Sequence, residues 1–172
     1  MTSATPASPG SDPLELSLTR LRNPDPEVLL ELEEYDEEAF GATGLRRYDL
    51  AVMAEAGAVY LARIGDEIAG GCQLIRVLDE PGFCYVVGFY VRPAWQGRGL
   101  GRRLLTMVAE ECRALSIEGL MLTVAPENVR AMTLYKTAGF GIEAFAPHFY
   151  GAGEDRYVLR WRFAEGGLSG SV

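Results

Sequence analysis

Residues 91–101 read VRPAWQGRGLG and lie between a run of strand-forming residues and a run of helix-forming residues. Glycine occupies three alternate positions, Gly97, Gly99 and Gly101, although a turn from a strand into a helix requires fewer. Glycines at the N-terminus of a helix let an anion approach free backbone N–H groups, and the helix dipole favours negative charge there. The stretch therefore predicts a strand–turn–helix unit that binds phosphate.

The spacing of these glycines excludes two common phosphate-binding motifs. The Rossmann fingerprint requires GxGxxG, and the Walker motif requires a Gly-Lys pair, which the chain lacks. Residues 96–101, QGRGLG, instead fit the pattern Gln/Arg-x-x-Gly-x-Gly/Ala. For this stretch taken alone, a tight turn that packs a helix close to a strand is the structural alternative.

The composition is that of one acidic globular domain. The chain has 172 residues, 48% of them hydrophobic, and a formal net charge of -8. This charge argues against a nucleic-acid partner and fits a cationic small molecule or a basic peptide, although solubility alone also explains it. Cys72, Cys84 and Cys112 are odd in number and lie in expected core segments, so we expect free thiols in a reducing compartment and no metal site.

Alternating and helical patterns give the order of the expected elements. Strand-like runs occupy 14–21, 58–65, 67–77, 82–91, 119–126, 140–150 and 155–163, and helical patterns occupy 27–40, 46–55, 100–115 and 129–138. This order predicts an α+β fold, with a mixed sheet of about seven strands flanked by about four helices.

The chain ends are expected to lie outside this single domain, which spans 14–163. Residues 1–13 are rich in Pro, Ser, Thr and Ala and have no basic residue, so we expect a disordered lead and no signal peptide. Residues 164–172 are expected to be a flexible tail. The longest apolar run is too short to cross a bilayer, so the expected location is the cytoplasm, without a membrane partner.

A second motif lies downstream, at residues 127–140, ENVRAMTLYKTAGF. Its pattern is Asn-x-x-Ala-x-x-Leu-Tyr-x-x-x-Gly-Phe. Together with residues 96–101, this motif resembles the two signatures of the GNAT superfamily of N-acetyltransferases, over roughly residues 14–163. The ribosomal-protein N-terminal-alanine acetyltransferases are the most similar members. The resemblance implies acetyl-CoA as co-substrate, no metal, and direct transfer of the acetyl group to a primary amine in a ternary complex.

The resemblance also implies a set of cofactor-binding residues. The strand before the glycines would bind the pantetheine arm and the acetyl carbonyl through its backbone. Strand amides cannot serve a ligand and a neighbouring strand together, so the sheet should splay beside 119–125, and Gly88 would suit a β-bulge there. The expected cofactor-binding residues are Phe89, Tyr90, Val91, Gln96, Gly97, Arg98, Gly99, Leu100, Gly101, Arg102, Asn128 and Tyr135.

Tyr135 is the expected general acid. Acyl transfer from a thioester expels a thiolate, which needs a proton. A phenol titrates near ~10 and a thiol near ~8.5, so at neutral pH a tyrosine holds a proton to donate. In the family, the tyrosine at this position protonates the sulfur of CoA. The structural alternative is that Tyr135 packs in an amphipathic helix beside Leu134 and Ala138.

The general base remains unassigned by the sequence. The strand 82–91 has no carboxylate, and Thr123 stands where similar family members have a glutamate. The candidates are Glu127 and His148, with Asp79, Glu80, the acidic first helix and a water relay as alternatives. An α-amine acceptor, with a pKa near ~7.7–8.0, would need little help from a base.

The acceptor is expected to be a protonated primary amine, namely a peptide N-terminus, a lysine or a polyamine. Residues 147–159 resemble the ribosomal-protein enzymes, which would place Phe149 and Tyr150 along the acceptor channel, and Glu34 represents the acidic first helix. Two other functions stay open. The domain could bind or sense acyl-CoA without catalysis, or bind ATP, although no Mg²⁺-ligand motif is present. The oligomeric state, monomer or homodimer, is also left open.

Overall fold

The computed structural model describes residues 15–164, so the expected lead at 1–13 and all of the expected tail except Ala164 lie outside the described residues. The described chain forms seven strands, four α-helices and two short 3-10 helices. In order, these are β1 (Leu16–Leu21), α1 (Pro26–Phe40), η1 (Gly41–Thr43), α2 (Arg47–Ala56), β2 (Ala58–Ile64), β3 (Glu67–Arg76), β4 (Phe83–Val91), η2 (Pro93–Trp95), α3 (Leu100–Ala114), β5 (Gly119–Val124), α4 (Val129–Ala138), β6 (Gly141–Ala146) and β7 (Arg156–Arg162).

The strands form one mixed sheet in the order β1-β2-β3-β4-β5-β7-β6. Every neighbouring pair is antiparallel except β4 and β5, which are parallel and joined through α3. The α+β fold with seven strands and four helices confirms the prediction from the sequence. β6 ends earlier than the run 140–150 suggested, because Pro147 has no N–H for the ladder and His148 has a positive φ of 53°.

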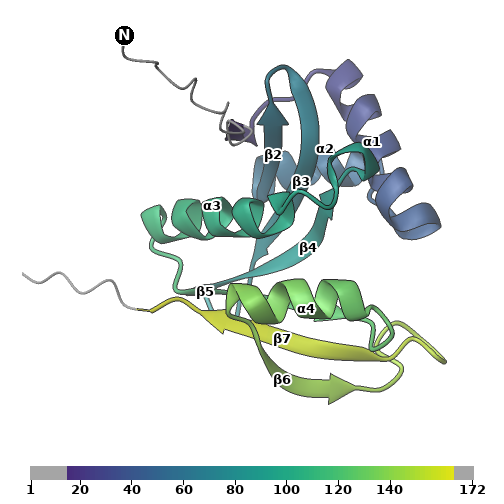
Figure 1. The fold of residues 1–172 in the computed structure, drawn as a ribbon, viewed down its shortest axis with the longest axis vertical. Helices are drawn as coiled ribbons and strands as arrows, with labels where there is room; N and C mark the ends of the chain where they lie inside the picture. The colour runs from purple at the N-terminus through teal and green to yellow at the C-terminus, as the bar shows by residue number, and fades with distance from the viewer. Residues whose placement is uncertain (1–14, 165–172) are drawn as a thin grey trace, which may run out of the picture.

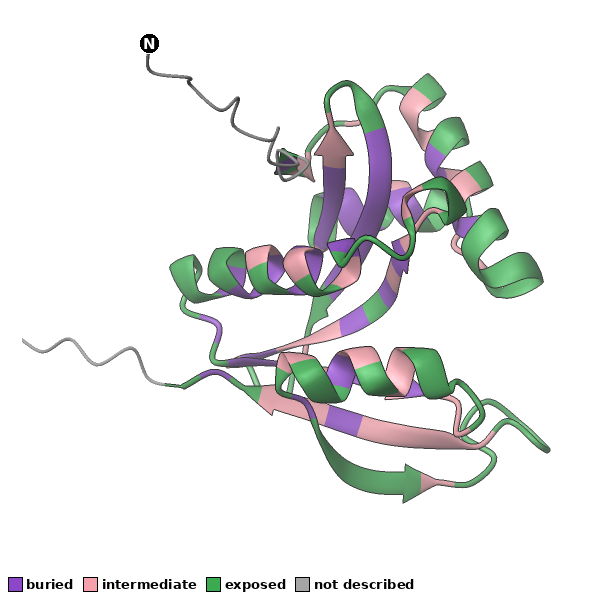
Figure 2. Ribbon diagram, viewed as in Figure 1, coloured by how far each residue is buried: buried purple, intermediate pink, exposed green. Residues whose placement is uncertain are grey.

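Helices cover both faces of the N-terminal half of the sheet (Figures 1 and 2). Alternate residues of β2 divide between two hydrophobic clusters. Tyr60 belongs to the larger cluster, with the buried face of α3, whereas Val59 and Leu61 belong to the smaller cluster, with α1 and α2. β4, which continues the same sheet, is therefore held between α3 on one face and α1 on the other.

The sheet splays in its middle, as predicted. β4 and β5 pair only at Phe83, Cys84 and Tyr85, although both strands continue beyond this point. A β-bulge lies just after the separation: Leu74 and Gln73 pair with Val86 and Gly88, which leaves Val87 as the extra residue. A Cβ at Gly88 would lie 2.4 Å from the Gln73 Oε1 atom, so glycine there permits close packing beside the bulge.

No helix in the part of the chain that the structure describes is long and apolar enough to cross a membrane.

Candidate active site

A cleft of about 530 Å³ opens where β4 separates from β5. Its walls come from the end of β4, the turn into α3, the first two turns of α4 and the last turns of α1. Every expected cofactor-binding residue lines this cleft except Arg98, whose guanidinium lies 5.0 Å from the centroid of the Trp95 ring. The structure thus brings together the two motifs, which are separate in the sequence.

The glycine turn forms the end of the cleft beside α3. Gly97 and Gly99 have φ angles of 76° and 72°, in the left-handed region that favours glycine. α3 begins at Leu100, so the N–H groups of its first turn have no partner within the helix. A Cβ at Gly101 would lie 3.3 Å from Leu134 Cδ2 of α4 and 3.8 Å from Val91 Cγ2. The turn therefore combines an anion-binding backbone with close packing of helix and strand.

Gln96 connects the three elements that meet at this turn. Its side-chain Nε2 donates to the Val91 carbonyl oxygen at 2.8 Å, and its Oε1 accepts from Arg130 Nη1 at 2.8 Å. Arg130 and Arg102 both line the cleft and place two cations beside the free amides. The sequence reasoning missed Arg130. Its position two residues after Asn128, in the first turn of α4, was the available signal.

Tyr135 lines the cleft from α4, and the residue is only 9% exposed. Its ring meets Phe89 and Phe140 edge to face, with centroid distances of 6.1 Å and 5.5 Å. Burial raises the pKa of its hydroxyl above the ordinary value, so the phenol keeps its proton at neutral pH. Asn128, at the other end of the helix, caps α4 by accepting a hydrogen bond from Ala131 N at 3.1 Å.

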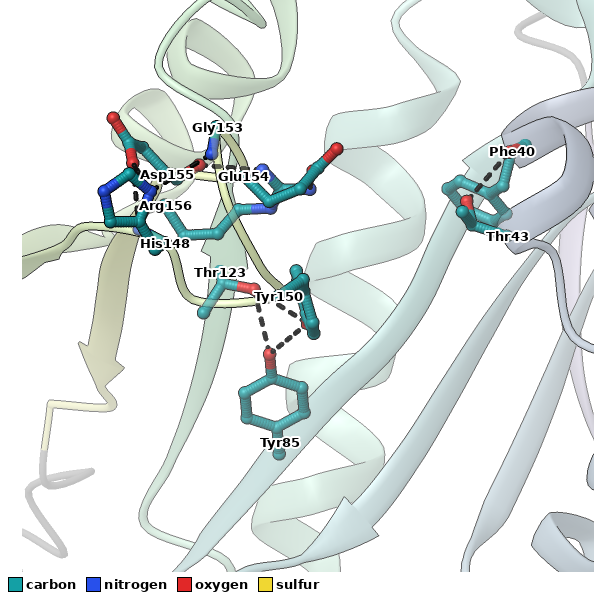
Figure 3. Close-up of polar contacts among 10 residues, drawn as sticks. All are labelled: Phe40, Thr43, Tyr85, Thr123, His148, Tyr150, Gly153, Glu154, Asp155 and Arg156. Carbon is teal, nitrogen blue, oxygen red and sulfur yellow. Dashed lines mark hydrogen bonds and ion pairs between the residues drawn. The ribbon is translucent and has the colours of Figure 1, made fainter.

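On the sheet face that α1 and α2 cover, three hydroxyl groups meet where β4 and β5 separate (Figure 3). The Tyr85 hydroxyl lies 3.0 Å from Thr123 Oγ1 and 3.5 Å from the Tyr150 hydroxyl, and Thr123 Oγ1 lies 3.3 Å from the Tyr150 hydroxyl. We call these residues the hydroxyl cluster. Burial raises the pKa of Tyr85 to about 12. Thr123, which occupies the position of the expected glutamate, is thus part of a neutral network.

The candidate bases do not reach this cluster. His148 is bound within its own loop, where Nδ1 accepts from Gly153 N at 3.1 Å, and it lies apart from the hydroxyl cluster (Figure 3). Glu127 is exposed and does not line the cleft, and Asp79 lies in the exposed turn between β3 and β4. Glu80 forms an ion pair with Arg160. None of these four groups lines the cleft.

The acidic first helix reaches the cleft only at its C-terminal end. Glu34 is exposed and lies outside the cleft, whereas Tyr35, Glu38 and Phe40 line it. Glu38 is the one carboxylate among the described residues that line the cleft, and it pairs with Arg92 at 3.4 Å. The Arg92 guanidinium also lies 3.8 Å from the centroid of the Tyr35 ring. The sequence pattern predicted the helix but did not predict which of its turns lines the cleft.

Tyr150 of the hydroxyl cluster pairs with a second exposed aromatic side chain, Phe149. Phe149 and Tyr150 are 45% and 61% exposed, and their rings meet edge to face with a centroid distance of 4.7 Å. Arg156 lies over the Tyr150 ring at 5.0 Å and pairs with Glu154 at 2.8 Å. The loop between β6 and β7 thus places an aromatic pair at the mouth of the splay.

The comparisons with known proteins agree with this geometry. An IAA acetyltransferase of Azospirillum brasilense is 27% identical over 114 residues, which cover 66% of this chain and 74% of the relative. The N-alpha-acetyltransferase RimI of Mycobacterium tuberculosis is 35% identical over 101 residues, covering 58% of this chain and 62% of the relative. The crystal structure of the ribosomal-protein-S18-alanine N-acetyltransferase of Escherichia coli shares the fold, with a TM-score of 0.73 and 20% identity over 92% of this chain and 100% of that chain.

The model of the acetyltransferase (GNAT) family matches residues 16–140, which contain the glycine turn, the splayed strands and α4. This match confirms the resemblance drawn from the two motifs. The chain belongs to the acetyltransferase (GNAT) family.

Proposed function

We propose that this protein transfers the acetyl group of acetyl-CoA directly to a primary amine, and that the acceptor is the α-amine of a peptide. The observation that carries the proposal is the cleft itself. It has an anion-binding turn at one end and a buried phenol on α4. The hydroxyl cluster does not line the cleft but lies where the same strand, β4, separates from β5.

The residues of the cleft fit acetyl-CoA by their chemistry. The amides of the first turn of α3, with Arg102 and Arg130, would bind the pyrophosphate. β4 pairs with β3 on one side only beyond Tyr85, so its other edge is available to the amide groups of the pantetheine arm. When bound, acetyl-CoA supplies the acetyl thioester. The chain's task is then to orient the thioester and to move two protons.

Tyr135 would supply the proton that the departing sulfur needs. The pKa of its buried hydroxyl lies above that of a thiol, so the phenol is protonated when transfer begins. The packing of its ring between Phe89 and Phe140 restricts its orientation. If Tyr135 only packs against its neighbours, removal of its hydroxyl should change kcat little. Substitution by phenylalanine therefore distinguishes a packing role from a catalytic one.

The hydroxyl cluster would carry the proton that the amine loses. Each hydroxyl can accept one proton while it donates its own, so no phenolate has to form. Tyr85 and Thr123 lie at the separation of the strands, and the exposed Tyr150 connects them to solvent. This route supports a mechanism without a carboxylate base.

The missing carboxylate also favours one class of acceptor. At pH 7, roughly 10% of an α-amine with a pKa near 8 is neutral, compared with roughly 0.04% of a lysine side chain with a pKa near 10.4. An enzyme whose base is weak therefore acts best on an amine that has already lost its proton. Phe149 and Tyr150 would contact the first side chains of such a peptide.

The missing carboxylate equally supports a second candidate, a domain that binds acyl-CoA without transferring the acyl group. CoA release from acetyl-CoA distinguishes the two. The acceptor panel contains peptides with a free α-amine, N-terminally blocked peptides with one lysine, and spermidine. We expect release above the hydrolysis background with the free α-amine peptides. Release with none of the acceptors, while acetyl-CoA raises the Tm, would identify a sensor. Faster release with lysine or spermidine would overturn the α-amine assignment.

A further inference from the structure

A second pocket, of about 270 Å³, lies at the C-terminal end of α3 and shares no lining residue with the active-site cleft. Two of the three cysteines line it, Cys84 from β4 and Cys112 from the last turn of α3. Leu74 and Ile117 contribute apolar walls. The proposed acetyl transfer uses none of these groups, so the pocket needs an explanation of its own.

The two thiols form an unequal pair. Both side chains line the same pocket, and each thiol shifts the pKa of the other. Cys84 is partly exposed, whereas Cys112 is 1% exposed and Cys72, the third cysteine, is fully buried. A small molecule in the pocket would therefore reach Cys84 more readily than Cys112, which lines the same pocket.

The surroundings of the pocket favour an anionic sulfur at Cys84. Arg20 and Arg76 line the pocket, and the Nε of Arg20 is buried without a hydrogen-bond partner among the described residues. The neighbouring Cys112 thiol and the charge of Arg76 lower the pKa of Cys84, although its partial burial opposes this effect. The Cys84 thiol, together with burial, raises the pKa of Cys112. Thiols with these surroundings are the reactive ones in proteins.

Other titratable groups near the pair complete its electrostatic environment. Tyr60 lines the pocket with a buried hydroxyl that has no partner in the described chain, and burial raises its pKa to about 12, so it stays neutral. Glu111, next to Cys112 on α3, raises the pKa of that thiol further. The charge of Arg76 thus acts on Cys84 and the charge of Glu111 acts on Cys112, which separates the roles of the two sulfurs.

We propose that Cys84 is a reactive thiol, that small anionic electrophiles and peroxides reach it through the second pocket, and that Cys112 is its resolving partner. With an alkyl halide, the Cys84 thiolate displaces halide and forms a thioether. With hydrogen peroxide, the thiolate takes one oxygen to give a sulfenic acid and hydroxide, and the Cys112 thiol then expels water to give a disulfide. The two sulfurs together lose two electrons, which reduce the peroxide.

Alkylation tests the first part of this proposal. The native protein is treated at pH 7 with anionic iodoacetate or with neutral iodoacetamide, and each cysteine is quantified by mass spectrometry of peptides. We expect Cys84 to react about tenfold faster than Cys72 or Cys112. We also expect a higher ratio of iodoacetate to iodoacetamide rates than for a cysteine in a short peptide. Equal rates at the three cysteines, or a ratio no higher than that of the peptide, would overturn the proposal.

Charge variants test whether the guanidinium group causes this selectivity. Arg76→Gln should lower the iodoacetate to iodoacetamide ratio at Cys84. Arg22→Gln, which removes an exposed guanidinium from outside the pocket, should leave the ratio unchanged. An equal response of the two variants would mean that the net charge of the protein, and not the pocket, sets the ratio.

Hydrogen peroxide tests the second part. We expect the protein to lose two hydrogens in mass and to yield a Cys84–Cys112 linked peptide, which dithiothreitol cleaves. Cys112→Ser should accumulate a sulfenic acid at Cys84 that dimedone traps, and Cys72→Ser should behave like the unaltered protein. Over-oxidation of Cys84 without a linked peptide would overturn the resolving role. The readout is independent of acetyl transfer, so failure of the proposed function would not change it.

Discussion

The two sides of the splayed sheet are built by different means. The donor side uses backbone groups of one continuous stretch, residues 96–102, held by two glycines with positive φ. The acceptor side uses side chains from segments far apart in the chain, and 65 residues separate Tyr85 from Tyr150. A backbone site keeps its chemistry whichever side chains surround it, whereas a side-chain site changes with each substitution. One donor can therefore be combined with many acceptors on this fold.

The largest effect should come from Tyr135, the proposed general acid. We expect Tyr135→Phe to lower kcat about 10²- to 10³-fold, because the leaving sulfur loses its proton donor. The Kd for acetyl-CoA should change by less than about twofold, because the ring and its packing remain. Steady-state kinetics and calorimetric titration measure the two quantities. Equal losses in both would assign Tyr135 to binding and packing.

The first helix, α1, also contains a buried carboxylate. Asp36 of α1 is 0% exposed and accepts hydrogen bonds from Leu45 N at 3.3 Å and Gln73 Nε2 at 3.1 Å. Burial raises its pKa from 3.8 to about 6. The folded chain therefore binds a proton in this window that the unfolded chain does not bind, so this residue's contribution to stability falls as pH rises from about 4 to 6.

Asp36→Asn should remove this loss. We expect the variant to be more stable than the unaltered protein at pH 7, by on the order of 2 kcal/mol, and to show a flatter stability profile between pH 4 and 6. The new amide can donate to Gln73 Oε1, which has no partner among the described residues, once the Gln73 amide turns. Urea unfolding at several pH values measures this. Asp66→Asn, in an exposed turn, is the matched control, and a loss of stability in Asp36→Asn at pH 7 would contradict the assignment.

Disturbing the donor backbone should affect binding more than folding. Gly99→Ala places a Cβ at a φ of 72°, which costs roughly 1–2 kcal/mol and tilts the amides of the first turn. We expect the Kd for CoA to rise about tenfold. Gly65→Ala, in a turn with a φ of 57°, should cost similar stability and leave the Kd unchanged. If both variants weakened CoA binding equally, the turn would have no special part in it.

The smallest effect should follow a single change in the hydroxyl cluster. Thr123→Val keeps the shape of the side chain and removes one hydroxyl, so we expect kcat with an α-amine peptide to fall about fivefold because water can partly replace the connection. The Kd for acetyl-CoA should stay constant. Thr19→Val, at an exposed position of β1, is the control for the substitution itself. An unchanged kcat would exclude the cluster as the proton route.

The contrast between the two sides also explains what could be predicted from sequence. The glycine turn and the second motif are local, so their spacing was sufficient to show the family resemblance, which in turn implied the donor cleft and the splay. The acceptor side depends on distant packing. Glu34 and Glu38 are four residues apart on one helix face, yet only Glu38 lines the cleft, because periodicity gives the face of a helix but not the distance along its axis. The sequence around Thr123 likewise does not indicate that its side chain contacts Tyr85 and Tyr150.

The short contact between β4 and β5 has a mechanical consequence. Only Phe83, Cys84 and Tyr85 join the strands of one half of the sheet to those of the other. A Cβ at Gly119 would lie 2.4 Å both from the Phe83 ring and from the Trp161 carbonyl oxygen, so this joint is tightly packed. The two halves of the sheet thus meet at one short, tightly packed contact between β4 and β5. Small rotations of the halves about this contact would widen or narrow the gap between the two strands, where donor and acceptor must meet.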